Sequence, residues 1–238
     1  MSLRGAAFLC LWNDFDRSMT EEYERWHTLE HVRERVAAPG FLAARRYGDL
    51  ARAENRYLTL YDLADMAALS TPDYADLQAN PTPWSARMRP HFSNVLRIPF
   101  HRIASEGEGF AAHVALLAYE IAESDSTAAE ALAERLAARH DRGESVAFHV
   151  GRAQDVPAYG VFQLQADARP GVQILVAIEE CTTPEAAAKS LQALRDDQAR
   201  NAPDARILRA ETSGFLYAVG HEEAVTRWRR QHKVPSLD

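Results

Sequence analysis

The chain has 238 residues, of which 47% are hydrophobic and 26% are charged, and its formal net charge is −7. These values are typical of an ordinary globular protein that is long enough to bury a core in one large domain or in two smaller ones. Basic residues never occur more than two in a row, whereas nucleic-acid binding needs clustered positive charge. We therefore expect no nucleic-acid partner.

The sequence also indicates where the protein resides. The N-terminal apolar run is short and is followed at once by Asn13, Asp14 and Asp16, which is not the pattern of a signal peptide. No stretch approaches the roughly 20 apolar residues that a membrane span requires. Cys10 and Cys181 each lie in an apolar run, so we expect two reduced core cysteines and no disulfide. A cytoplasmic protein without a membrane partner is the resulting expectation.

The first half predicts the element order β-α-β-β-α-β. An apolar run of strand length covers about Ala6 to Trp12, and Ser18 with Glu21 forms a capping box at the start of a helix. We expect this helix to reach Ala38, because apolar residues recur every three or four positions and form one buried stripe. The stripe comprises Met19, Tyr23, Trp26, Leu29, Val32 and Val36. Two strands over 41–48 and 56–63, a helical region over 64–89 broken by prolines, and a strand over 93–103 complete the unit.

The second half repeats this order with less clarity. A small, polar, glycine-bearing stretch at 105–109 is the natural boundary and predicts two domains, 1–105 and 106–238. We expect strands over 112–121, 145–151, 172–179 and 207–219, and helices over 127–140 and from Pro184 onward. Residues 159–165 resemble an extra strand that the pattern does not place.

The pattern predicts an α+β fold with two tandem ferredoxin-like halves. Each half would form a four-stranded antiparallel sheet with both helices on one face. The helix-free faces would pack together into an intrachain, pseudo-dimeric α/β barrel. In the strand over 56–63, Leu58 and Leu60 alternate with Tyr57, Thr59 and Tyr61. We expect the aliphatic face to meet the helices and the aromatic face to line a space between the sheets.

Two neighbouring segments resemble a known family. The stretch YERWHTLEHV over 23–32, followed by PGFLAARRY over 39–47, is similar to the EthD-like branch of the dimeric α/β-barrel superfamily. The shared pattern is a helix with Trp26 and His31, five residues apart, and then a strand that ends in Arg and Tyr. The resemblance covers roughly residues 5–103; in the second half only the element order agrees. The superfamily includes haem-binding proteins, cofactor-free oxygenases and lactone isomerases, so the resemblance implies a fold more than a function.

Histidines on the first helix are candidates for chemistry. His27 and His31 lie four residues apart with Arg35 four further, and a His-x-x-x-His pair could grip a metal. Zinc usually takes at least three protein ligands, and no third ligand is placed, so we assign no metal site. The alternative for His27 is a solvated polar face that also contains Glu24, Glu30, His31 and Arg35.

His31 matches the family's helix histidine, and its ordinary pKa near neutrality suits proton transfer. The alternative is a histidine that ties the helix to a strand through one hydrogen bond. Trp26 belongs to the apolar stripe, and could also form one wall of a ligand pocket.

Arg45, Arg46 and Tyr47 lie near the end of the strand over 41–48, with Arg45 and Tyr47 on one face and Arg46 on the other. Buried arginine is costly unless it is paired or faces a wet cavity. One of these two arginines is therefore expected to face an anionic or carbonyl-bearing ligand. A salt bridge to Asp62, Glu34 or Glu54 is the alternative. Tyr57, Tyr61 and Trp84 are expected to line the same site.

Three functions follow from these residues. The first is a cofactor-independent enzyme that acts on a small apolar or aromatic compound with a carbonyl or hydroxyl group, where His31 is the acid or base and Arg46 and Tyr47 stabilise charge. The second is a non-catalytic small-molecule or haem-binding module, and the third is a structural scaffold. No motif requires a cofactor, since neither a phosphate loop nor a nucleophile elbow is present. Both a monomer and a homodimer remain compatible with the sequence.

Overall fold

A computed structural model of the chain describes residues 3–154 and 171–227. The predicted extra strand at 159–165 lies outside these residues. The described strands are β1 Ala7–Phe15, β2 Phe41–Gly48, β3 Tyr57–Leu63, β4 Phe92–Gly107, β5 His113–Ala122, β6 Ala147–Ala153, β7 Val172–Cys181 and β8 Arg206–Gly220. The α-helices are α1 Thr20–Trp26, α2 Val32–Val36, α3 Pro72–Ala79, α4 Pro83–Met88, α5 Ala128–Asp141, α6 Pro184–Asn201 and α7 His221–Arg227. No helix in this part of the chain is long and apolar enough to cross a bilayer.

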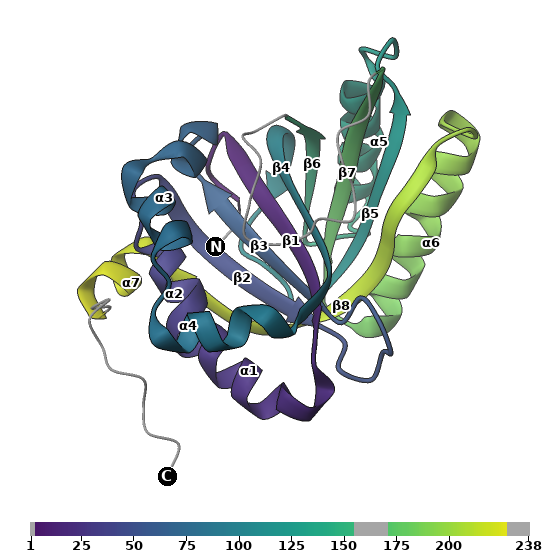
Figure 1. Cartoon of the computed structure of the whole chain (residues 1–238). Coiled ribbons are helices and arrows are strands. Elements are labelled where there is room, and N and C mark those ends of the chain that lie inside the picture. Colours follow the sequence, from purple (N-terminus) through teal and green to yellow (C-terminus); the bar gives the residue numbers. More distant parts are fainter. Residues whose placement is uncertain (1–2, 155–170, 228–238) are drawn as a thin grey trace.

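All described strands join one closed antiparallel barrel in the order β1-β3-β2-β8-β5-β7-β6-β4. Within β1–β4 the order is fourth, first, third, second, and the same relative order holds within β5–β8. Two seams close the barrel, one where β2 pairs with β8 and one where β4 pairs with β6. The helices lie outside it, α1 to α4 over the β1–β4 side and α5 and α6 over the β5–β8 side (Figure 1). The predicted α+β barrel is therefore confirmed.

Several predicted boundaries differ from the structure. β4 continues to Gly107, through most of the stretch interpreted as a linker, so the connection to β5 comprises residues 108–112. The predicted cap at Ser18 is wrong, because Ser18 lies inside a 3-10 turn, Arg17–Met19, that precedes α1. Asp16 caps this turn by accepting a hydrogen bond from the backbone N–H of Ser18, and α1 itself begins after Met19 without a side-chain cap. The sequence analysis did not predict α7, a short helix after β8.

The barrel interior is filled by aliphatic and aromatic side chains from strands on both the β1–β4 side and the β5–β8 side. Leu58 and Leu60 belong to this interior cluster together with Phe8, Leu116 and Ile178. The expected orientation of β3 is thus wrong. An eight-stranded barrel is just wide enough for side chains to fill, so the compact leucines occupy it.

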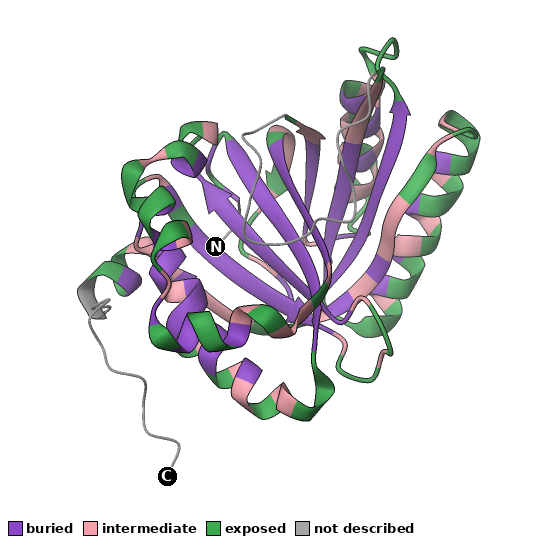
Figure 2. Ribbon diagram, viewed as in Figure 1, coloured by how far each residue is buried: buried purple, intermediate pink, exposed green. Residues whose placement is uncertain are grey.

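The other face of β3 meets the helix layer. Tyr57 packs with Tyr23, Trp26 and Trp84, and Tyr61 packs with residues of α2 such as Val32. Strands β1, β2, β3, β5 and β7 are buried over most of their length, β8 and the ends of β4 are only partly buried, and the helices are buried along their inner sides (Figure 2). Large polar-tipped side chains therefore collect between the helices and the sheet.

Candidate functional site

The helix that covers β1–β3 contains a π-helical turn. His27–His31 forms this turn between α1 and α2, and the N–H of Val32 donates to the carbonyl oxygen of His27, five residues earlier. Such turns are rare and are frequent at functional sites. A π turn holds one residue more than an α turn, so it changes which side chains face the sheet.

As a result, both histidines point inward. The side chains of His27 and His31 are 0% and 1% exposed, whereas Leu29, which was predicted to be core, is 45% exposed. Glu30 and Arg35 are buried as well, so the predicted solvated polar face is wrong. The α-helical periodicity used for the prediction does not hold across the wide turn.

Aromatic rings surround the two imidazoles. The ring centroids of Trp26 and His31 are 4.4 Å apart, those of His27 and His31 are 4.9 Å apart, and those of Tyr23 and His27 are 5.0 Å apart. Phe92 lies 6.4 Å from His31. The histidines thus occupy an aromatic environment.

Arg46 enters this environment from the sheet. Its Nη1 donates to Thr28 Oγ1 at 2.6 Å and lies 3.0 Å from Glu24 Oε2. Its guanidinium carbon lies 5.4 Å from the ring centroid of Tyr23 and 5.9 Å from that of Tyr57. The side chain is only 1% exposed, so its charge acts in a medium of low dielectric constant. We call Tyr23, Trp26, His27, His31, Arg46, Tyr57 and Trp84 the helix-side cluster.

The imidazoles have unused hydrogen-bonding capacity. Neither ring nitrogen of His27 has a hydrogen-bond partner among the described residues, and neither has Nδ1 of His31. A buried polar group without a partner costs about 1–3 kcal/mol, so most such groups in folded proteins are satisfied. Such atoms occur in other parts of the described chain as well, and in this cluster they are the imidazole nitrogens that a ligand could use.

Both histidines are neutral at physiological pH. Burial is the main cause that holds the pKa of His27 well below its usual value, and the charges of Arg46 and Arg35 add to it. Burial likewise lowers the pKa of His31, assisted by Arg35 and by the neighbouring His27. Neutral imidazoles can accept a proton, and an anion formed beside them would lie close to Arg46.

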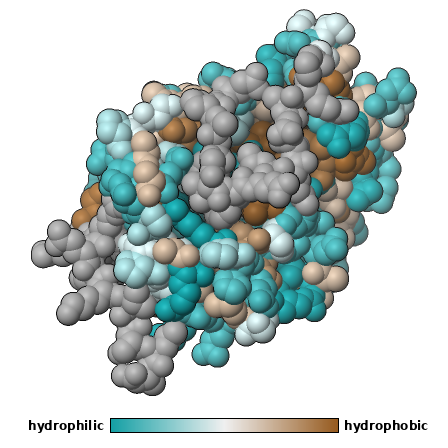
Figure 3. All heavy atoms as spheres, viewed as in Figure 1, coloured by the Kyte–Doolittle hydropathy of each residue, from teal (hydrophilic) through white to brown (hydrophobic). Residues whose placement is uncertain are grey.

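A helical segment closes the cluster from solvent. Trp84 on α4 is 2% exposed, and its Nε1 donates to Glu22 Oε1 at 3.1 Å. Glu30 accepts hydrogen bonds from Trp26 Nε1 at 3.2 Å, from Ser85 Oγ at 3.0 Å and from Thr82 Oγ1. On the face of the molecule shown in Figure 3, hydrophilic residues predominate over this helical layer. The histidines are thus closed off from solvent in this arrangement.

The structure does not bring all the predicted site residues together. His31, Arg46, Trp26, Tyr57 and Trp84 meet in the helix-side cluster. Tyr61 lies apart, with its ring centroid 5.7 Å from that of Phe41.

Arg45 and Tyr47 point into the barrel, where Arg45 forms an ion pair with Glu180 and the hydroxyl of Tyr47 lies 3.3 Å from Glu180 Oε2. The alternation along β2 requires this separation, so Tyr47 cannot act beside His31. Arg45 forms a salt bridge, as the alternative prediction expected for an arginine of this strand. Its partner is Glu180 and not Asp62, Glu34 or Glu54.

Two members of the cluster were missed as functional candidates. His27 was assigned to a solvated face, and Tyr23 only to the core stripe. The spacing of four residues between His27 and His31 was interpreted only as a possible metal grip, although it also places both rings on one side of a wide turn.

The dimeric α/β-barrel superfamily includes haem-binding proteins, so haem is the cofactor to test against this site. A bound haem would need a histidine as axial ligand. Tyr23 and His31 lie against the ring of His27, and the side chain of His27 has no exposed surface. Haem needs a histidine that faces an open cavity, whereas this imidazole is packed between neighbouring rings, so the arrangement does not fit a haem. In the described part of the chain, no group of three or more His, Cys, Asp or Glu side chains is arranged to hold a metal ion.

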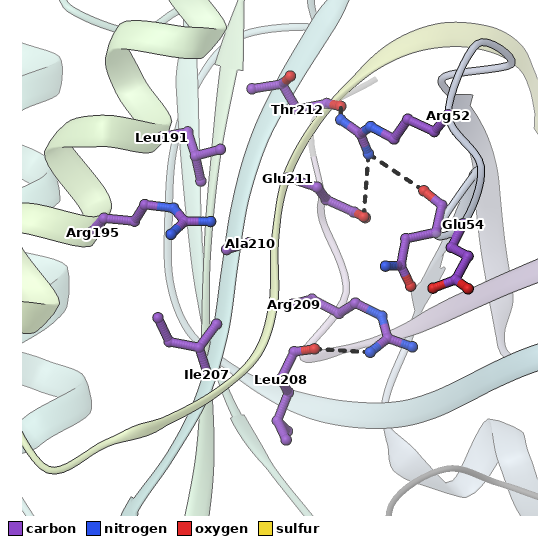
Figure 4. Close-up of a pocket in the computed structure, with 11 residues that line it drawn as sticks. Arg52, Glu54, Leu191, Arg195, Ile207, Leu208, Arg209, Ala210, Glu211 and Thr212 are labelled. Atoms are coloured by element: carbon purple, nitrogen blue, oxygen red, sulfur yellow. Dashed lines mark hydrogen bonds and ion pairs between the residues drawn. The ribbon is translucent and has the colours of Figure 1, made fainter.

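A separate pocket of about 440 Å³ lies where the barrel wall is interrupted. The pairing of β2 with β8 stops at Gly48 and Gly214, and β8 continues to Arg206 beside β5 alone. The pocket follows this edge (Figure 4) and is lined by Arg52, Glu54, Asn55, Leu191, Arg195 and residues 207–212. Burial raises the pKa of Glu211 in this pocket to about 7, although Arg52 and Arg209 oppose the shift. The pocket shares no residue with the helix-side cluster.

Comparison with known proteins identifies the fold. No family model and no curated protein matches the chain. Among solved structures, an anthrone oxidase-like protein superposes with a TM-score of 0.62 at 11% identity, over 94% of this chain and 97% of that chain. A proposed monooxygenase from Fusobacterium nucleatum superposes with a TM-score of 0.55 at 10% identity, over 91% and 95% of the two chains. A second such protein, from Lactobacillus acidophilus, gives 0.50 at 11% identity over 90% and 96%. The chain therefore has the fold of the dimeric α/β-barrel superfamily, and this likeness is one of fold.

Proposed function

We propose that the protein is a cofactor-independent enzyme that acts on a small apolar or aromatic compound bearing a carbonyl or hydroxyl group, and that the helix-side cluster is its active site. The observation that carries this proposal is the pair of buried, neutral histidines with unused nitrogens beside the buried cation Arg46. Neutral bases and a fixed positive charge are what proton abstraction next to a carbonyl, or from a phenol, requires.

In the proposed reaction, His31 accepts a proton from the substrate and Arg46 stabilises the resulting enolate or phenolate. Tyr57, on the same face as Arg46, takes the role that the sequence analysis gave to Tyr47. The aromatic rings of Trp26 and Trp84 would stack on the flat substrate.

The names of the structural neighbours favour molecular oxygen as the second substrate. A CH₂ group that loses a proton to His31 would pass electrons to O₂; one oxygen atom stays on the carbon as a carbonyl and the other leaves as water.

The same topology supports two ferredoxin-like halves fused in one chain. The sequence pattern divided them at 1–105 and 106–238, and we place the division a few residues later, in the connection between Gly107 and β5. Each half would supply four strands in the same relative order. In the second half, the corresponding space under α5 and α6 contains Glu179, which is paired with Arg139 and accepts from Ser190. This pairing favours a single copy of the helix-side cluster per chain. The protein is further proposed to be a cytoplasmic monomer or homodimer of the EthD-like branch.

The test combines binding and turnover. Thermal shift with a panel of phenols, anthrones and 1,3-diketones identifies a ligand, and oxygen uptake measures turnover. We expect His31→Asn and Arg46→Lys each to reduce turnover at least 100-fold, because general acid–base catalysis contributes about 10²–10⁴. His101→Asn, which alters an exposed histidine on β4, is the control. Full turnover in both site variants would exclude the proposal.

The second candidate is a non-catalytic binding module. It is favoured by the closed state of the cluster, in which His27 has no exposed surface. In that case ligands would stabilise the protein in the thermal-shift panel, the stabilisation would be lost in Arg46→Lys, and no oxygen would be consumed.

A further inference from the structure

A second cluster of reactive side chains lies inside one end of the barrel. Ser105 on β4 is directly opposite His149 on β6, and β7 carries Glu180 next to them. Their side chains share the inner face, because His149 is opposite Ile178, a member of the interior cluster. Three adjacent strands thus present a serine, a histidine and a glutamate from a rigid support.

The distances place these groups side by side. Ser105 Oγ lies 2.6 Å from His149 Nδ1 and also lies 3.5 Å from the carbonyl oxygen of Leu3. His149 Nε2 lies 3.6 Å from Glu180 Oε1, which is a charge contact beyond hydrogen-bond distance, and this nitrogen has no hydrogen-bond partner among the described residues. Glu180 is held in place by Arg45, by the hydroxyl of Tyr47 and by the backbone N–H of Ala111 at 2.9 Å. Arg45, which was predicted to bind substrate, and Tyr47, which was predicted to stabilise charge in catalysis, therefore fix the carboxylate of this second cluster.

The position of Glu180 selects a tautomer for His149. A carboxylate beside Nε2 favours a proton on that nitrogen, which leaves the Nδ1 lone pair to accept the hydroxyl proton of Ser105. Burial lowers the pKa of His149 in spite of the opposing effect of Glu180, so the imidazole is neutral at pH 7. Burial opposes the ionisation of Glu180, but His149 and Arg45 outweigh it and hold the carboxyl pKa below its usual value.

From this geometry we propose that Ser105, His149 and Glu180 form a nucleophilic triad that cleaves small activated esters. The roles match those of known triads: a hydroxyl nucleophile, an imidazole base and a carboxylate that orients the base. This activity is independent of the helix-side cluster, with which it shares no residue.

The covalent step is acyl transfer. The Ser105 oxygen attacks the ester carbonyl and its proton passes to His149 Nδ1. As the new bond between Oγ and the acyl carbon forms, the bond to the leaving oxygen breaks, and His149 returns the proton to that oxygen. Water, activated in the same way, then releases the acid from Ser105.

Accessibility restricts the substrate class. Ser105 is partly exposed, whereas the side chains of His149 and Glu180 are fully buried. Only a short acyl group can therefore reach the nucleophile. Nη2 of Arg45 is buried without a hydrogen-bond partner in the described residues, and Arg45 is close enough to act on the pKa of His149. This guanidinium is the cation available to stabilise negative charge on the acyl group.

The experiment uses a small fluorophosphonate and p-nitrophenyl acetate on the full chain. We expect the fluorophosphonate to add once, with loss of fluoride, and peptide mass spectrometry to locate the adduct on Ser105. p-Nitrophenol should be released in a burst of one equivalent per chain. Ser105→Ala should abolish both signals, while Ser93→Ala, an exposed serine on the same strand, should leave them unchanged.

Glu180→Gln distinguishes a triad from a merely accessible serine. It keeps an acceptor for the Ala111 N–H but removes the charge that orients His149, so labelling should slow at least 100-fold in protein that remains folded by circular dichroism. An unlabelled wild-type protein, an adduct on another residue, or equal labelling rates for wild type and Glu180→Gln would overturn the proposal.

Discussion

Arg45 on β2 and Glu180 on β7 form a buried ion pair across the interior of the barrel, between strands that are 135 residues apart in the chain. Their side chains are 2% and 0% exposed, so neither charge is compensated by water. Glu180 of this pair also accepts hydrogen bonds from the hydroxyl of Tyr47 and from the backbone N–H of Ala111.

Removing either charge of this pair should destabilise the fold strongly. Because an uncompensated buried charge remains, we expect Arg45→Met and Glu180→Gln each to lower the free energy of unfolding by about 3–5 kcal/mol. The double variant should lose at least about 1 kcal/mol less than the sum of the singles, since the two sites are coupled. Urea denaturation of the four proteins measures this cycle, and additive losses would show that the pair does not interact.

Stability should fall as the pH is lowered from about 6.5, because buried histidines must bind protons on unfolding. The pKa values of His27 and His31 are depressed in the folded protein, so below about pH 6.5 the unfolded chain binds more protons than the folded chain. Each histidine then lowers the free energy of unfolding by about 1.4 kcal/mol per pH unit, until the pH reaches the pKa of that histidine in the folded protein. A His27→Gln/His31→Gln double variant should show a shallower dependence between pH 7.5 and 5.

The comparison with that double variant isolates the two histidines. The pKa of His149 is lowered, like those of the two histidines, and the pKa of Glu211 is raised. Both groups are present in the wild type and in the variant, so their contributions to the pH dependence cancel in the comparison. Parallel pH profiles from urea denaturation would contradict the neutral, buried state of His27 and His31.

Glu211 should have the reverse effect. Its folded pKa of about 7 lies above the usual 4.5, so the carboxyl favours the folded state in acid and loses that contribution as the pH rises through 7. We expect Glu211→Gln to raise the free energy of unfolding at pH 8 by roughly 3 kcal/mol, from about 1.4 kcal/mol per pKa unit. At pH 4 the variant and the wild type should be equally stable. A variant that is less stable at pH 8 would show that the charged carboxylate is required there.

The π turn makes a prediction about Leu29. Because this side chain points outward, Leu29→Gln should change the free energy of unfolding by no more than about 0.5 kcal/mol. Val32→Ala, which removes a fully buried side chain beyond the turn, should cost roughly 1–3 kcal/mol. If the segment were a regular helix, Leu29 would belong to the core and the order of these two losses would be reversed.

Local pattern was sufficient to predict most of the fold. The strand over 41–48 agrees with β2 at both ends, since Pro39-Gly40 stops the preceding helix and Gly48 precedes a polar loop. The alternation that separates Arg45 from Arg46 is confirmed by their partners, Glu180 inside the barrel and Thr28 outside it.

The candidate site was only partly predictable. His31, Arg46 and Trp26 were identified, because residue type and spacing depend on nearby positions. The inward orientation of His27 depends on a backbone hydrogen bond between residues five positions apart, His27 and Val32. The periodicity of the side chains does not reveal such a bond. The partner of Arg45 depends on closure of the barrel between distant strands, so no local pattern points to Glu180 or to the alignment of Ser105 with His149.

The seam between β2 and β8 has a consequence for biosynthesis. Ala43 pairs with Gly220, so the edge of β2 stays uncovered until nearly the whole chain has been made. At about 5–20 residues per second, the ribosome needs on the order of 10–30 s to progress from β2 to β8. During that interval a strand edge is open to pairing with other nascent chains, which makes β2 the place where mispairing during synthesis would begin.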